Sequence, residues 1–189
     1  MAPQIKLDAN FTSTGDALQV TYTATNPQTR PVWLLDKIWQ YTPTGDPVED
    51  PYGAYLSLGV DGLLNIGRIL HPLPQAMLVE QRLVPHARQL AGLTSLTETF
   101  SLALPLTEYN PYYDDPARED QLAKETTAAR FLLSWVPELP GMTIRDAPLA
   151  GVKLLDAPSF MPEVRTERTA AVVLKVAAKR RTDDFERLA

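Results

Sequence analysis

The stretch LQVTYTAT, residues 18–25, places an apolar residue at every second position and a polar residue after each of them. A period of two is that of a β-strand with one buried face and one exposed face. The threonines on the polar side strengthen this interpretation because β-branched residues favour strands. Residues 5–11 alternate in the same way, and the polar residues 13–16 separate the two stretches. The sequence therefore predicts a β-hairpin at the start of the chain.

Further short stretches with the composition of strands follow along the chain. Asp61 and Gly62 lie between two of them, and an Asp-Gly pair favours a two-residue type I′ turn, which predicts a second hairpin. Residues 42–52 and 85–92 are expected to be irregular connections, and residues 115–124 a short helix. The further strands are expected over residues 32–39, 54–60, 63–70, 77–84, 97–104, 129–136, 152–155 and 169–178.

No segment with helical periodicity lies between the expected strands, which excludes a parallel sheet built from strand–helix–strand units. The sequence therefore predicts an all-β fold. A two-sheet antiparallel sandwich with long Pro-rich loops is the most economical arrangement, and a barrel is the alternative. A repeat of fixed period is also missing from the sequence, so a solenoid or propeller is not expected.

Proline divides the chain into its parts. It makes up 17 of the 189 residues, about twice its ordinary usage, whereas there are 9 glycines. The prolines gather in four connections, at 43–51, 72–85, 105–116 and 137–162, where they restrict the backbone. Because a chain of this length usually forms one domain, we expect a single β-sandwich domain over residues 1–181 and a charged tail over residues 182–189.

Residues 20–33, VTYTATNPQTRPVW, resemble the second and third strands of immunoglobulin-like β-sandwich accessory domains. In those domains a strand rich in Thr and Val ends at an Asn, turns, and resumes after a Pro. Intracellular proteinase-inhibitor-like sandwiches and fibronectin-like modules have a similar pattern. The resemblance implies an immunoglobulin-like form of the sandwich. The chain differs from antibody domains because it lacks their pair of cysteines.

The composition excludes several classes of function. With no cysteine, the chain has no thiolate nucleophile, zinc–thiolate site or iron–sulfur cluster. A net charge of −5 argues against a general nucleic-acid-binding protein, which would carry a basic stripe. The apolar runs are much shorter than the roughly 20 residues that span a bilayer, and no signal peptide is visible. We therefore expect a cytoplasmic protein without a membrane span.

The sequence also lacks motifs of catalysis and cofactor binding. The nucleophile elbow, the P-loop and the dinucleotide-binding fingerprint are missing. The two histidines, His71 and His86, lack metal-ligand spacing and each stand next to a proline, so we expect them in surface loops. Trp33, Trp39 and Trp135 fall on expected strands, where core packing is favoured over ligand binding. The sequence therefore predicts no enzyme, no cofactor and no metal site.

The most unusual segment is the loop 108–120, which is rich in acids and tyrosines. Between residues 108 and 125 there are six acidic and two basic residues, and carboxylate oxygens are ligands that Ca²⁺ prefers. The spacing is not that of an EF-hand and no glycine lets the loop wrap an ion, so a solvated acidic loop is favoured over a cation site or a site for a basic partner. The candidate binding residues in this loop are Tyr109, Tyr112, Tyr113, Asp114 and Asp115.

The tyrosines of this loop offer a second kind of site. Together with Tyr41 and Tyr52 of the proline-rich loops, they would form an aromatic rim for a peptide or a carbohydrate. The favoured alternative is that each ring packs under a proline and each hydroxyl bonds locally.

The function that these observations favour is a non-enzymatic binding or accessory domain that acts through protein–protein contacts, either with an unidentified protein partner or by self-association. Strand edges and stiff loops are natural contact surfaces because proline lowers the entropy lost on binding. Two alternatives remain. One is a Ca²⁺- or glycan-binding module, or a sandwich enzyme, that uses the loop 108–120. The other is a protease-inhibitor-like domain, which the fold resemblance alone implies.

Overall fold

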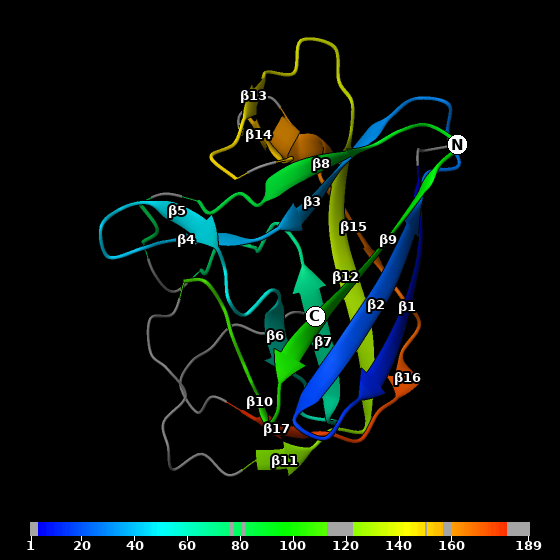
Figure 1. Cartoon of the computed structure of the whole chain (residues 1–189), viewed down its shortest axis with the longest axis vertical. Coiled ribbons are helices and arrows are strands. Elements are labelled where there is room, and N and C mark those ends of the chain that lie inside the picture. Colours follow the sequence, from blue (N-terminus) through cyan, green and yellow to red (C-terminus); the bar gives the residue numbers. More distant parts are fainter. Residues whose placement is uncertain are drawn as a thin grey trace.

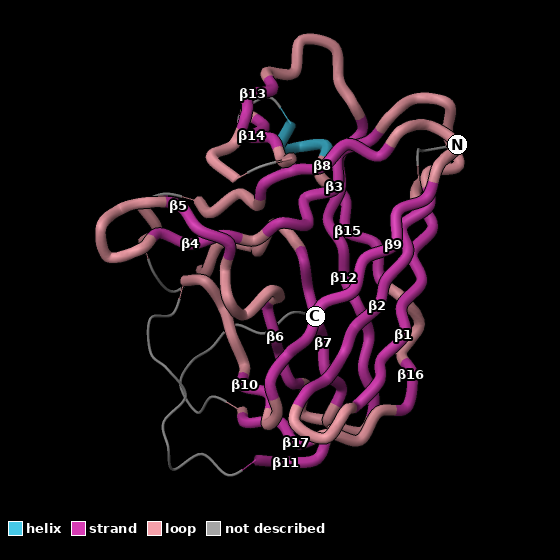
Figure 2. The backbone as a smooth tube through the Cα atoms, viewed as in Figure 1, coloured by secondary structure: helices cyan, strands magenta, loops and turns pink. Residues whose placement is uncertain are grey.

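A computed structural model of the protein describes residues 4–75, 78–80, 82–112, 123–149, 151–156 and 160–180. Within these ranges the elements are β-strands, apart from one 3₁₀ turn, η1 (Met161–Glu163), drawn in cyan in Figure 2. The fold is all-β, as the sequence predicts, and two of its sheets form packed layers. Two small sheets complete the described part: β4 (Trp39–Tyr41) with β5 (Pro47–Glu49), and β17 (Ala177–Lys179) between β10 (Leu106–Thr107) and β11 (Ala123–Glu125).

The first layer is a three-stranded antiparallel sheet with the order β1–β2–β9 (Figure 1). β1 (Lys6–Ser13) and β2 (Ala17–Thr25) form the hairpin that the alternation predicts, with Phe11 opposite Val20. β9 (Ser95–Ala103) lies along the other edge of β2 over its full length of 9 residues. The expected strand over 97–104 is therefore confirmed.

The second layer is a larger mixed sheet with the order β13–β14–β8–β3–β12–β7–β6, in which β15 and β16 also pair with β12 (Figure 1). Its strands are β3 (Val32–Lys37), β6 (Tyr55–Leu58), β7 (Leu63–Arg68), β8 (His86–Leu90), β12 (Ala128–Pro137), β13 (Ile144–Asp146), β14 (Lys153–Leu155), β15 (Arg165–Arg168) and β16 (Val172–Val173). Strands are therefore confirmed in the expected ranges 32–39, 54–60, 63–70, 129–136 and 152–155, with shifts at their ends.

β12 crosses the centre of the large sheet and pairs in parallel with β7, from Ala128 opposite Leu63 to Leu133 opposite Arg68. The expectation of a wholly antiparallel sandwich is therefore wrong. The chain between these two strands is long enough to return in the same direction, because it passes through β8 in the same sheet and through β9 in the other. Alternation in a sequence indicates which face of a strand is buried, but not which strands are neighbours.

The main core lies between the two layers. It combines Tyr22 of the first layer with Ile66 and Phe131 of the second, and the rings of Tyr22 and Phe131 stack with centroids 4.7 Å apart. A second cluster, which includes Trp33 and Phe160, covers the opposite face of the large sheet. Because both faces of β3 are buried, this strand is apolar at most of its positions and does not alternate.

The strand expected over 77–84 is wrong. None of its described residues is in a strand, and Leu78 is almost fully exposed. The strand begins instead at His86, in the segment expected to be a connection. Prolines bound the apolar run on both sides, at Pro74 and Pro85, and a proline has no backbone donor for a β-ladder.

Two turns also differ from expectation. Residues 42–52 are not wholly irregular, because β4 and β5 form a hairpin that projects at the left of Figure 1, and Pro47 is accepted at the first position of β5. Between β6 and β7, the amide of Gly62 donates to the carbonyl of Gly59 at 3.1 Å, and only Gly62 of this turn has a positive φ. The turn is therefore longer than the two-residue type I′ turn.

The last part of the described chain forms several short strands instead of the one that was expected. The single strand expected over 169–178 is wrong, since β15 and β16 pair with β12 whereas β17 leaves to pair with β10 and β11. The C-terminal end of the helix expected over 115–124 is also wrong, because Ala123–Glu125 is strand β11. Residues 115–122 and the charged tail 182–189 lie outside the described residues.

Candidate binding site

Glu98 is a charged residue on the inner face of β9. It alternates with the partly buried Leu96 and Phe100, so its side chain points between the layers. Its carboxylate oxygen Oε1 accepts hydrogen bonds of 2.7 Å from Lys37 Nζ and from Arg68 Nη1, and Oε2 pairs with Arg88 Nη2. Burial alone raises the pKa of Glu98. The hydrogen bonds from Lys37 and Arg68 and the positive charges of Arg68 and Arg88 outweigh burial and lower this pKa to about 2.

Asp36 is the second carboxylate of this network and is fully buried on β3. The hydroxyl of Tyr22 donates to its Oδ2 at 2.7 Å, and Arg88 Nε lies 3.1 Å from both carboxylate oxygens. Burial raises the pKa of Tyr22, and the negative charge of Asp36 raises it further. The tyrosine therefore remains a hydrogen-bond donor to the carboxylate at neutral pH.

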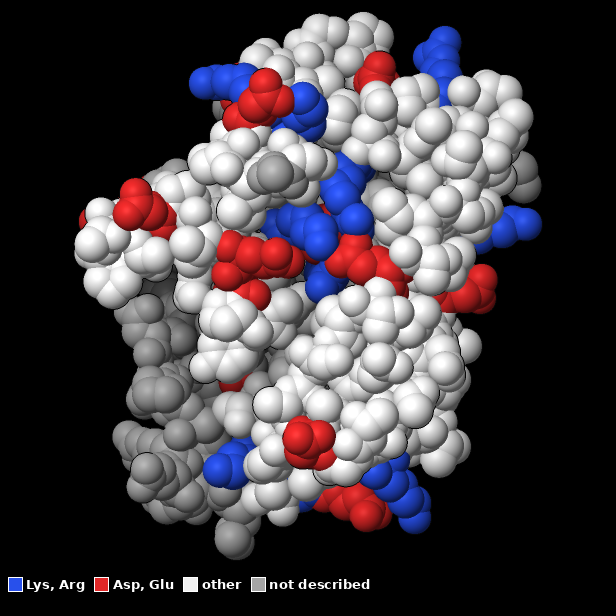
Figure 3. All heavy atoms as spheres, in the orientation of Figure 1, with Lys and Arg blue, Asp and Glu red and all other residues white. Residues whose placement is uncertain are grey.

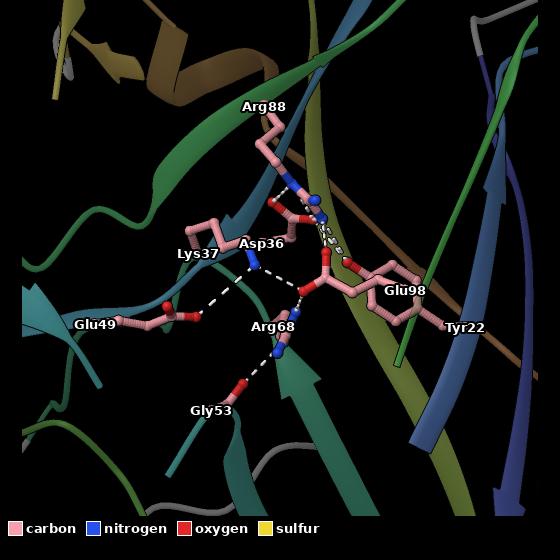
Figure 4. A network of polar contacts seen from close by, with 8 residues as sticks. All are labelled: Tyr22, Asp36, Lys37, Glu49, Gly53, Arg68, Arg88 and Glu98. Atoms are coloured by element: carbon pink, nitrogen blue, oxygen red, sulfur yellow. Dashed lines mark hydrogen bonds and ion pairs between the residues drawn. The ribbon is translucent and has the colours of Figure 1, made fainter. Parts of the chain in front are cut away.

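Arg68, the last residue of β7, contributes its guanidinium to the same network. Its Nε donates to the carbonyl of Gly53 at 2.8 Å, and its guanidinium lies 4.0 Å from the ring centroid of Phe100. A cation over an aromatic face gains electrostatic attraction as well as contact. Lys37 has a second, longer pair with Glu49 of the β4–β5 hairpin, at 3.8 Å (Figure 4).

We name Asp36, Lys37, Arg68, Arg88 and Glu98 the polar recess. Figure 3 shows the charged atoms gathered in a hollow near the centre of one face, bounded by uncharged surface. The side chains of Lys37, Arg88 and Glu98 are 19%, 21% and 17% exposed, so the recess is open to solvent. Within the described residues, Arg88 Nη1 donates no hydrogen bond.

The free edge of β9 runs beside this recess. Among the described strands β9 pairs with β2 alone, so the backbone groups on its second edge have no strand partner. The outward hydroxyls of the strand are already paired with those of β2: Thr99 with Thr21 at 2.8 Å and Thr97 with Thr23 at 2.9 Å. The groups of β9 that remain available to a binding partner are therefore its unpaired backbone edge and the charged side chains beside that edge.

The candidate residues Tyr109 and Tyr112 are packed side chains. The backbone of Tyr109 exchanges two hydrogen bonds with Leu56, its hydroxyl donates to Asp50 Oδ2 at 2.5 Å, and its ring stacks on Tyr52 at 4.3 Å. The hydroxyl of Tyr112 accepts the amide proton of Leu83 at 3.2 Å. Both hydroxyls are therefore engaged within the fold, by residues that are distant in the sequence. The remaining candidates Tyr113, Asp114 and Asp115 lie outside the described residues.

Both histidines are buried, so their expected place in surface loops is wrong. The ring of His71 meets the edge of Tyr55, with centroids 5.2 Å apart. His86 stacks on Trp39 at 5.1 Å, and burial lowers its pKa. Tyr41, which belongs to the alternative aromatic rim, packs on Trp39 at 4.8 Å. The core role expected of Trp135 is confirmed, because its side chain is fully buried between the layers.

A groove of about 960 Å³ lies at the start of β1, away from the polar recess. Its apolar lining includes Ile5, Pro31 and Pro140, and its charged lining includes Glu167 and Arg168. In the part of the chain that the structure describes, no group of three or more acidic or histidine side chains is placed to hold a metal ion. No helix in that part is long and apolar enough to cross a membrane.

The sequence interpretation did not single out any residue of the polar recess. A signal was present, since Glu98 occupies the same inward phase as Phe100 and Leu102 in an otherwise regular alternation. A charge at an inward position is costly unless it is paired, so it marks a place where other charges converge. The identity of the partners, which come from β3, β7 and β8, was not visible because it depends on the packing of the two layers.

Comparison of the chain with models of protein families, with curated proteins and with solved structures finds no match in any of the three. A function for this chain is therefore inferred from its own residues and geometry.

Proposed function

We propose that this chain is a non-enzymatic binding domain that takes up an extended segment of a partner protein along the free edge of β9. The observation that carries this proposal is the nine-residue edge of β9, which among the described strands is paired on one side only and lies beside the polar recess. Extended peptides bind such edges by adding a strand, with main-chain hydrogen bonds for affinity and side-chain pockets for specificity. The polar recess supplies the pocket.

The position of β9 is fixed before any partner arrives. Glu98 ties the strand to Lys37 and Arg88 and, through Arg68, to β7 of the second layer. A pre-organised edge loses less entropy on binding than a flexible one. The edge is also longer than the five or six residues of a typical strand, so it offers more main-chain hydrogen bonds than most edges do.

The chemistry of the polar recess supports binding over catalysis. A general base works best with a pKa near the operating pH. The pKa of Glu98 is lowered to about 2 by its cationic partners, so this carboxylate is a poor proton acceptor at neutral pH. Asp36 is fully buried behind Tyr22 and Arg88 and does not reach solvent.

The finer description of the fold belongs to the same proposal. Two layers around one core, together with the resemblance of residues 20–33, support an immunoglobulin-like accessory domain. Asn26, at the end of β2, supports it further, because its buried side chain bonds the carbonyls of Arg30 and Ala91 and so closes the turn in that segment.

A selection from a random library of nine-residue linear peptides displayed on phage tests the proposed function. The wild-type chain serves as bait, and a Thr97→Lys/Thr99→Lys variant serves for counter-selection because lysines on an edge strand oppose pairing. We expect enriched peptides that shift the amide signals of residues 95–103 in a ¹⁵N-labelled chain. A lack of enrichment over the variant, or shifts confined to other strands, would contradict the proposal.

The absence of cysteine allows a second measurement on the same peptides. The variant Thr99→Cys carries a unique thiol on β9, and Thr12→Cys carries one on the exposed side of β1. Enriched peptides with a single cysteine are expected to form a disulfide with the β9 variant and not with the β1 variant. Equal yields from the two variants would place the peptide elsewhere.

A further inference from the structure

We infer that the polar recess binds a carboxylate side chain of the segment that pairs with β9, so that the partner carries an aspartate or glutamate flanked at the second position on each side by apolar residues. This inference rests on the proposed function and names the chemistry of the partner. Its support comes from the charge of the recess, from the donors that the recess leaves free and from the alternation of β9.

The charges of the polar recess do not balance. It holds the three cations Lys37, Arg68 and Arg88 but only the two carboxylates Asp36 and Glu98. An arginine keeps its charge at any physiological pH, and both carboxylates are bound by these cations. Counted without the exposed Glu49, the recess therefore carries one excess positive charge, which an incoming carboxylate would neutralise.

Glu49 compensates for this excess only weakly. It reaches Lys37 from the projecting β4–β5 hairpin at 3.8 Å, and its side chain is 58% exposed. An exposed pair at this distance contributes little stability because water competes for both charges. A ligand carboxylate placed between Lys37 and Arg88 would meet both cations where they are about four-fifths buried, so each contact would be stronger than the one with Glu49.

Two donors are available to such a ligand. Arg88 uses Nε and Nη2 for Asp36, Tyr22 and Glu98, whereas its Nη1 donates no hydrogen bond within the described residues. Lys37 Nζ carries three protons and has one close acceptor, Glu98 Oε1 at 2.7 Å. Charge-assisted hydrogen bonds from ammonium and guanidinium groups to carboxylates are among the strongest in proteins.

The alternation of β9 determines the spacing of the partner's side chains. On the inner face Glu98 stands between Leu96 and Phe100, both partly buried apolar residues that pack on the core. In an added strand every second side chain faces the same way. A carboxylate beside Glu98 would therefore be accompanied by side chains beside Leu96 and Phe100, where apolar groups are favoured.

A second copy of this chain fits the recess less well. Its own β9 would offer the carboxylate of Glu98, but three cations of its own recess already hold that group. To reach Arg88 of the other copy, Glu98 would have to leave these partners. A separate acidic segment has no such cost, so we assign the site to a partner protein.

The test uses three synthetic peptides, acetylated and amidated, with the sequence Thr-Val-Thr-X-Thr-Val-Thr, where X is Glu, Gln or Lys. Each is titrated into the ¹⁵N-labelled full chain, and Kd is taken from the amide shifts of residues 95–103. We expect the Glu peptide to bind about tenfold more tightly than the Gln peptide and the Lys peptide to bind most weakly, because a hydrogen bond to a charged group is worth about one factor of ten or more.

The variant Glu49→Gln sharpens this test, since this side chain is exposed and its ion pair with Lys37 is a long one, at 3.8 Å. It removes the competing carboxylate from Lys37, so affinity for the Glu peptide is expected to rise by about threefold, while affinity for the Gln peptide stays unchanged. Glu125→Gln is the matched control, because Glu125 also forms an exposed ion pair, with Lys175 at 3.9 Å, on another sheet. The control is expected to change neither affinity.

The possible results separate the inference from the proposed function. Equal binding of the Glu and Gln peptides, or no gain in Glu49→Gln, overturns the carboxylate site while leaving strand addition at β9 intact. Binding of none of the three peptides also overturns the carboxylate site. Failure of the phage selection to enrich peptides that act on residues 95–103 overturns strand addition itself.

Discussion

Glu98 on β9 and Arg68 on β7 are joined by a hydrogen bond of 2.7 Å between Oε1 and Nη1, which links the two layers of the fold. The arginine side chain is 3% exposed, so this bond neutralises a buried cation. The same carboxylate also forms ion pairs with Lys37 and Arg88, which belong to the second layer. Four strands therefore depend on this one side chain for their relative positions.

Replacement Glu98→Gln is expected to lower the free energy of unfolding by about 2–3 kcal/mol, because it leaves Arg68 buried without a full counter-charge. Urea unfolding followed by tryptophan fluorescence measures the change. The control is Glu125→Gln, which breaks an exposed pair and is expected to cost less than about 0.5 kcal/mol. Similar losses in the two variants would show that Glu98 does not stabilise the contact between the layers.

The stability of the wild-type chain is expected to depend on Glu98 at acid pH. The pKa of this residue is about 2 in the folded chain, below its ordinary value of 4.5. A lowered pKa means that the stabilisation is fully present above pH 5 and is lost as the pH falls towards 2. The loss should reach about 2 kcal/mol after allowance for solvent at this partly exposed group. Unfolding curves from pH 6 to pH 2.5 should therefore fall more steeply for the wild type than for Glu98→Gln, and parallel curves would contradict this assignment.

Tyr22→Phe removes one hydroxyl and leaves the ring in place. The hydroxyl donates to the fully buried Asp36 at 2.7 Å, so its loss is expected to cost about 1–3 kcal/mol. The stack on Phe131 should remain, because it involves only the ring. Thermal unfolding of this variant is to be compared with that of Tyr41→Phe, whose side chain is half exposed. A shift in Tm no larger than that of the Tyr41 control would argue against the hydrogen bond.

Asn26→Asp is expected to lower the free energy of unfolding by about 2–3 kcal/mol. The amide Nδ2 of Asn26 donates to the carbonyls of Arg30, at 2.8 Å, and Ala91, at 3.2 Å, and the whole side chain is buried. An aspartate would remove the donor and place a negative charge against carbonyl oxygens. Asn10→Asp, on the exposed face of β1, is the matched control and should be nearly neutral in a urea titration. If Asn26→Asp is tolerated equally well, the turn does not depend on this amide.

The regular alternation within residues 5–25 was sufficient to predict the hairpin of β1 and β2, because one buried and one solvated face leave a period of two. The same reasoning failed for the order of the large sheet. The pairing of β7 with β12 joins residues 65 positions apart, as in Ala128 with Leu63, and nothing in the local pattern of either strand specifies that neighbour. Local periodicity is a property of one strand, whereas pairing is a property of the packed fold.

The candidate site was likewise predictable only in part. The tyrosines of the loop 108–120 were recognisable by composition, but Tyr109 proved to be held by Asp50 and Leu56. The polar recess was not recognised, although Glu98 breaks an apolar phase and could have been noted as a buried charge. Its partner Lys37 lies in a segment expected to be a strand, and its partner Arg88 lies in a segment expected to be a connection. That these side chains meet depends on how the two layers pack, so it could not be deduced from the sequence.

The inward direction of Glu98 has a consequence for solubility. A long unpaired strand is a template on which other chains aggregate. The charged groups of the polar recess oppose such association, because a purely hydrophobic strand that docks there would remove water from them without replacing its hydrogen bonds. The edge of β9 is therefore a poor template for an apolar strand, despite its nine residues. Loss of this deterrent would appear as concentration-dependent precipitation before any loss of fold.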